Sequence, residues 1–113
     1  MEMEKIKEVL NKWAADKAPI TKVYIFGSRV KGDFRPDSDL DVALELYPIP
    51  GGEDAATLFW MTEEPKWKSE LQPRLPYILH LHYFEGDNTP TIKEGIRVSG
   101  VAVYNKNEWA DKK

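Results

Sequence analysis

Two aspartates separated by one residue, Asp39 and Asp41, are the side chains of this sequence best suited to hold metal ions. They open residues 39–46, which largely alternate acidic and apolar residues and so predict a half-buried strand. On a strand, positions i and i+2 point to the same face, about 6.5 to 7 Å apart along the chain. Carboxylate oxygens favour Mg²⁺ or Mn²⁺, which can activate an attacking oxygen and stabilise a leaving one. The alternative is a pair of acids that face solvent.

A glycine and a serine, Gly27 and Ser28, end the apolar run at residues 23–26, which predicts a buried strand. A glycine at this point lets the backbone approach a ligand closely. If a helical turn starts at Ser28, its free N–H groups and the serine hydroxyl form a natural phosphate site. The alternative is an ordinary turn at the end of a strand. Ten residues separate this pair from Asp39. The predicted phosphate-binding residues therefore follow one strand, and the predicted metal-binding residues open the next.

Hydrophobic periodicity predicts the elements that position these groups: helices at residues 2–15, 53–71 and 92–98, and further strands at 77–85 and 101–104. Pro65 is expected to divide the second helix into two pieces. The first two strands are joined by a short polar link, so they should pair antiparallel. This order favours an α/β (α+β) domain with a small mixed sheet and helices packed on one face.

Length and composition limit the class of protein. The 113 residues predict a single domain over residues 1–113, with a polar tail at about 105–113. A net charge of −3 argues against general nucleic-acid binding. The lack of cysteine excludes disulfides and thiol chemistry and fits a reducing compartment, so we expect a cytoplasmic protein. No stretch approaches the roughly 20 apolar residues of a membrane span.

The combined pattern resembles the signature of the polymerase-β-like nucleotidyltransferases. It consists of Gly27-Ser28, the ten residues 29–38, and Asp39-Leu40-Asp41. The likeness is to the small stand-alone members, the minimal nucleotidyltransferases, many of which are encoded beside a HEPN-domain partner. The N-terminal helix and residues 92–104 also look like that family. The resemblance implies a fold like the polymerase β palm.

The resemblance also implies roles for individual residues. Asp39 and Asp41 would hold two Mg²⁺ ions, or Mn²⁺, and Gly27 and Ser28 would contact the phosphates of a nucleoside triphosphate. A hydroxyl would attack the α-phosphate in line and release pyrophosphate. ATP is the substrate that the family suggests. Arg29 either assists with phosphate charge or is a solvated loop charge.

The later strand departs from the family pattern, which usually supplies a third carboxylate there. Residues 77–84 contain no acid, and Glu85 lies near the strand end. His80 occupies the place where the acid is expected, and His82 shares its face. One interpretation makes a histidine a metal ligand or a proton acceptor, with imidazole favouring Mn²⁺ or Zn²⁺ over Mg²⁺. The other is that the third carboxylate is lost and activity is weak or absent.

Three functions follow from the resemblance and this departure. The first is a metal-dependent enzyme that transfers AMP from ATP to a hydroxyl of a partner protein, as the antitoxin of a HEPN-type ribonuclease. The second is a degenerate binding module that neutralises such a partner by contact alone. The third is modification of a small molecule, as in aminoglycoside nucleotidyltransferases. The sequence leaves the partner's identity and homo-oligomer formation open.

Overall fold

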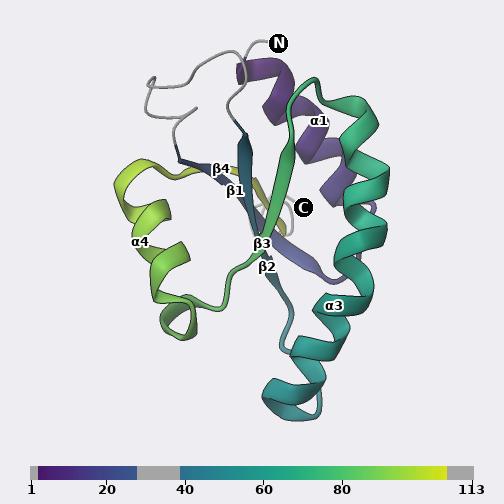
Figure 1. Cartoon of the computed structure of the whole chain (residues 1–113), viewed down its shortest axis with the longest axis vertical. Coiled ribbons are helices and arrows are strands. Elements are labelled where there is room, and N and C mark those ends of the chain that lie inside the picture. The colour runs from purple at the N-terminus through teal and green to yellow at the C-terminus, as the bar shows by residue number, and fades with distance from the viewer. Residues whose placement is uncertain (1–2, 28–38, 107–113) are drawn as a thin grey trace.

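The computed structural model describes residues 3–27 and 39–106 as a four-stranded sheet with three helices (Figure 1). The elements are α1 (Met3–Ala15), β1 (Ile20–Phe26), β2 (Leu40–Leu46), α3 (Gly52–Leu71), β3 (Leu79–Tyr83), α4 (Pro90–Ser99) and β4 (Val101–Asn105). The strand order is β3-β2-β1-β4. β1 pairs antiparallel with β2 and β4, whereas β2 pairs parallel with β3. The predicted α+β class, mixed sheet and antiparallel first pair are therefore confirmed.

Helices α1 and α3 lie on one face of the sheet and enclose the core (Figure 1). Leu10 of α1, Leu71 of α3 and Leu44 of β2 are fully buried there. Two tryptophans join the helices, because the Trp13 and Trp67 rings meet edge to face with centroids 6.1 Å apart. Burial of such large apolar side chains is the main stabilising term of a small domain.

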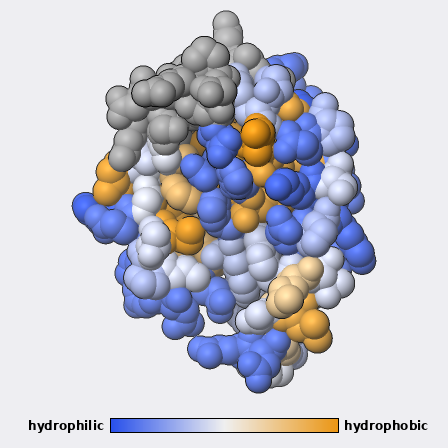
Figure 2. All heavy atoms as spheres, in the orientation of Figure 1, coloured by the Kyte–Doolittle hydropathy of each residue, from blue (hydrophilic) through white to orange (hydrophobic). Residues whose placement is uncertain are grey.

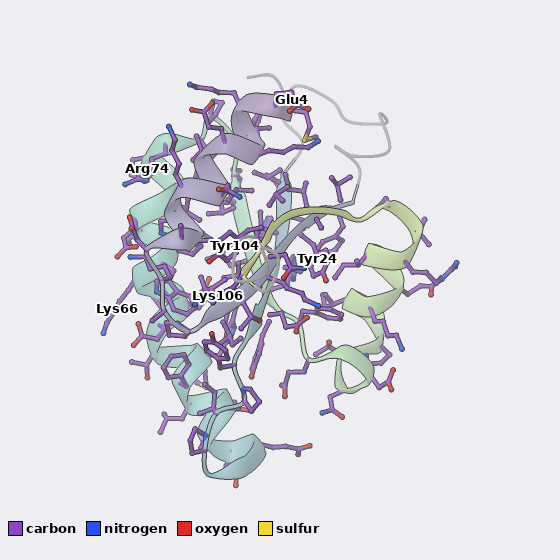
Figure 3. The ribbon with its side chains drawn as sticks, turned by 180° about the vertical axis from the view of Figure 1, so that it is seen from behind. Glu4, Tyr24, Lys66, Arg74, Tyr104 and Lys106 are labelled. Carbon is purple, nitrogen blue, oxygen red and sulfur yellow. The ribbon has the colours of Figure 1, made fainter. Side chains whose placement is uncertain are left out.

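Helix α4 lies on the opposite side of the sheet from α1 and α3 (Figure 1). The prediction of helices on one face therefore holds for the two long helices and needs correction for α4. The reason lies in β1, whose Tyr24 and Phe26 alternate with the core positions and need cover of their own. Gly95 of α4 packs directly on the Phe26 ring. Figure 3 shows Tyr24 on the side of the sheet toward α4, where its ring meets Phe84 edge to face.

Helix α3 runs unbroken through Pro65, so the prediction of two helical pieces is wrong. A proline removes one backbone hydrogen bond, here to the carbonyl of Met61 four residues earlier. Met61 is 66% exposed, so water can hydrate this region, and the buried Trp67 and Leu71 hold the following turns. None of the helices in the described residues is long and apolar enough to cross a membrane.

The bounds of β1 and β3 differ from the prediction by two or three residues. β1 begins at Ile20, three residues earlier than predicted, because Ile20 pairs with Leu46 at the far end of β2. β3 is shorter than predicted, since the Gln72 side chain bonds the backbone just before it. Its amide nitrogen donates to the carbonyl of Tyr77, and its oxygen accepts from the N–H of Leu79.

Candidate active site

Asp39 and Asp41 lie at the start of β2, in the middle of the sheet. Asp41 pairs with Phe26 at the end of β1 and with His80 of β3. The side chain of Asp39 is 45% exposed and that of Asp41 is 29% exposed, so both can meet a ligand from solvent. The strand brings the two carboxylates to one face, as their spacing predicts.

Each aspartate hydrogen-bonds to a histidine of β3. Nε2 of His80 lies 2.7 Å from Oδ2 of Asp39, and Nε2 of His82 lies 3.0 Å from Oδ1 of Asp41. An ionised carboxylate only accepts hydrogen bonds, so Nε2 of each ring donates, and in a neutral imidazole Nδ1 then carries the free lone pair. The parallel register explains the pairing. His80 lies beside Asp41 and His82 lies beside Ala43, and each histidine bonds to the aspartate two positions before that neighbour. The prediction that His80 and His82 face the aspartates is met.

The contact between His82 and Asp41 is not predictable from the sequence. The His82 ring also packs on Phe26, with centroids 5.3 Å apart. The register between strands decides which histidine meets which aspartate, and a single sequence does not specify it.

Gly27 ends β1 beside Asp41. Its φ of +89° lies in the region that favours glycine, and a Cβ there would come within 2.7 Å of Oδ2 of Asp41. A side chain at this position would therefore displace the carboxylate. The N–H of Gly27 donates to Oγ of Ser99, 3.0 Å away, so this amide is already engaged. Ser28 and Arg29, the other predicted nucleotide-binding residues, lie outside the described residues.

The donor set suits a divalent cation chemically but supplies few protein ligands. Among residues 3–27 and 39–106, no three His, Asp or Glu side chains converge on a point that would hold a metal ion. Mg²⁺ is commonly bound by only one or two carboxylates, and phosphate oxygens and water complete its shell. Asp39 and Asp41 fit that mode, in which the nucleotide brings part of the coordination.

A hollow lies elsewhere in the described part of the chain, near the other end of β2. It measures about 570 Å³, and its lining includes Glu45, Glu53, Glu85, Tyr47 and Phe84. Three carboxylates would repel a triphosphate. This hollow is therefore a poor nucleotide site, and the start of β2 is the better candidate. Figure 2 shows hydrophobic residues scattered over the visible face without one large patch.

A sheet that sets two carboxylates beside a strand-ending glycine is an arrangement suited to phosphoryl transfer. Residues 4–109 match the family described as polymerase beta, nucleotidyltransferase. Because the match spans most of the chain, the protein belongs to this family of nucleotidyltransferases. Comparison with curated proteins found no match.

Solved structures with the same fold include two toxin–antitoxin structures. A toxin–antitoxin with AMP-PNP is 18% identical with a TM-score of 0.64, covering 91% of this chain and 74% of that one. A mutant of the toxin–antitoxin MntA-HpeT is 14% identical with a TM-score of 0.63, covering 93% of this chain and 74% of that one. At these identities the likeness shows a shared fold.

Proposed function

We propose that the protein transfers AMP from ATP to a hydroxyl of a partner protein. The observation that carries this proposal is the placement of Asp39 and Asp41 on one face of β2, next to the glycine that ends β1. The family match supports nucleotidyl transfer as the reaction. The solved structures with this fold support the choice of acceptor and nucleotide, since one is a toxin–antitoxin with AMP-PNP.

Asp39 and Asp41 are the groups that we assign to divalent cation binding, Mg²⁺ or Mn²⁺. A bound cation would neutralise charge on the phosphates and lower the barrier to attack by the acceptor oxygen. The fixed backbone between the two aspartates keeps both carboxylates on the ligand side of the sheet. Their hydrogen bonds to His80 and His82 restrain the side-chain rotamers, which reduces the entropy lost when ligand binds.

The reaction forms a bond between the acceptor oxygen and the α-phosphorus, and it breaks the bond from that phosphorus to the bridging oxygen of pyrophosphate. The proton of the acceptor hydroxyl must leave. We assign its acceptance to Nδ1 of His80, since Nε2 is held by Asp39. The His80 side chain is 43% exposed, against 32% for His82, so it is the more accessible of the two.

A second function is favoured by one specific observation: β3 contains no carboxylate, and both aspartates already have imidazole partners. A protein with this site could bind its partner without modifying it. In that case the chain would be an antitoxin that acts by contact with a HEPN-type toxin, and Asp39 and Asp41 would be dispensable.

Transfer of label from α-labelled ATP to the protein encoded by the adjacent gene separates these functions. The reaction is run with Mg²⁺ and with Mn²⁺, and complex formation is measured in parallel. Labelled partner supports the enzyme. An unlabelled partner that still forms the complex supports the contact-only antitoxin. Transfer to an aminoglycoside and to no protein would instead support the small-molecule function.

A further inference from the structure

Ser99, the last residue of α4, connects the far end of the chain to the end of β1. Its Oγ accepts a hydrogen bond from the N–H of Gly27 at 3.0 Å and donates to the carbonyl of Gly95 at 3.2 Å. A serine hydroxyl has one proton and two lone pairs, so both bonds form at once. Donation to Gly95 orients the hydroxyl so that a lone pair is free to face Gly27.

These bonds belong to a closed ring of contacts around the candidate site. Gly95 touches Phe26 so closely that a Cβ would come within 2.9 Å of the ring. Phe26 packs on His82, and His82 bonds to Asp41. Asp41 in turn occupies the space that a side chain at Gly27 would fill. Helix α4 therefore supports both the glycine and the carboxylate that line the proposed nucleotide site.

We propose that Ser99 is a positioning residue for nucleotide binding, an inference that rests on the proposed function. Its hydroxyl fixes the peptide between Phe26 and Gly27 and so sets the position of Gly27 beside Asp41. It also engages the Gly27 N–H, so the phosphates must be bound by other groups. Removal of the hydroxyl leaves this part-buried N–H without its acceptor, and the peptide can rotate toward water.

Thr62 provides a matched control within the chain. Its hydroxyl donates to the carbonyl of Leu58, four residues earlier in α3, as Ser99 does to Gly95 in α4. Thr62 is exposed, and this hydrogen bond stays within α3. A loss caused by removing a helix hydroxyl in general would therefore appear in both variants, whereas a loss of positioning would appear only at Ser99.

The test measures the affinity of α,β-methylene ATP with MgCl₂, because its carbon bridge prevents transfer. Ser99→Ala should weaken binding about fivefold, the value of one net hydrogen bond. Ser99→Thr keeps the hydroxyl and should stay within about twofold of the wild type, as should Thr62→Ala. In the transfer assay, Ser99→Ala should raise the KM for ATP more than it lowers kcat.

Amide hydrogen exchange of Gly27 gives a second readout that needs no ligand. The amide should be protected in the wild type and in Ser99→Thr, and it should exchange faster in Ser99→Ala. An unprotected Gly27 amide in the wild type, or equal affinity for Ser99→Ala and wild type, would overturn the role of Ser99. A wild type that binds no nucleotide would overturn the proposed function and this inference together. Equal binding by wild type and Ser99→Ala would overturn this inference alone, so the two failures can be distinguished.

Discussion

The two faces of strand β2 differ in burial and in chemistry, although their residues alternate along one segment. Leu40, Val42 and Leu44 are fully buried against the helix layer. On the other face, Asp39 and Asp41 keep 45% and 29% of their side chains exposed. At the start of β2, therefore, the buried core side chains and the chemically reactive side chains lie on opposite sides of the strand. Substitutions on one face should therefore change folding, and substitutions on the other should change the reaction.

The largest expected effect on folding comes from the buried face. Leu44→Ala should lower the free energy of unfolding by about 2–5 kcal/mol, through lost burial and the cavity left behind. The rate of transfer per folded molecule should not change. Urea denaturation gives the free energy, with Leu58→Ala as the control, since Leu58 is 66% exposed. Equal destabilisation by the two variants would contradict the assignment of Leu44 to the core.

Substitution of Gly27 should affect both stability and transfer. Gly27→Ala should cost about 1–3 kcal/mol of stability for a non-glycine residue at positive φ. It should also suppress transfer, because the new Cβ would lie 2.7 Å from Oδ2 of Asp41. Gly52→Ala is the control, with a φ of +85° and open space around its Cβ. If both variants retain transfer per folded molecule, the close approach of Gly27 to Asp41 has no part in the reaction.

The neighbouring strand offers a smaller change that should alter the metal dependence of transfer. His80→Asp places a third carboxylate beside Asp41 in the register. Transfer supported by Mg²⁺ should rise about tenfold relative to transfer supported by Mn²⁺, because the variant adds an oxygen ligand of the kind that Mg²⁺ prefers. Initial rates with each metal measure this ratio. His80→Asn is the control, because it removes the imidazole and adds no carboxylate. An unchanged ratio for His80→Asp would show that position 80 does not reach the metal.

The smallest expected effect is on stability, and it comes from Glu70 in the helix layer. Hydrogen bonds from Lys17 and Trp13 hold the pKa of Glu70 below its ordinary value. A lowered pKa in the folded state stabilises the protein above the unfolded pKa, and this contribution is lost as the pH falls below about 4.3. Glu70→Gln should lower stability at neutral pH by less than about 1 kcal/mol, because the side chain is 44% exposed.

Urea midpoints at neutral and acidic pH measure the contribution of Glu70. The difference between wild type and Glu70→Gln should shrink as the solution is acidified. Glu64→Gln is the control, because Glu64 forms no ion pair within residues 3–27 and 39–106. A difference that grows on acidification would contradict the lowered pKa of Glu70 in the folded protein.

The sequence predicts much of this arrangement through periodicity. Alternation along residues 40–46 places the aspartates and the leucines on opposite faces, and the composition of residues 77–85 brings two histidines to the aspartate side. Periodicity does not report contacts between distant segments. The bond from Gly27 to Ser99 joins residues 72 positions apart, and no local pattern marks it. Helix α3 passes Pro65 because its tertiary packing outweighs local propensity.

The mass of the partner protein after incubation with ATP and a divalent cation reports directly whether this protein transfers adenylate. The wild type should add adenylate to the partner, and Asp39→Asn and Asp41→Asn should lower the rate by about a hundredfold or more. Both variants should keep the urea midpoint of the wild type, because neither side chain is in the core. Full adenylate transfer by either folded variant would contradict the account.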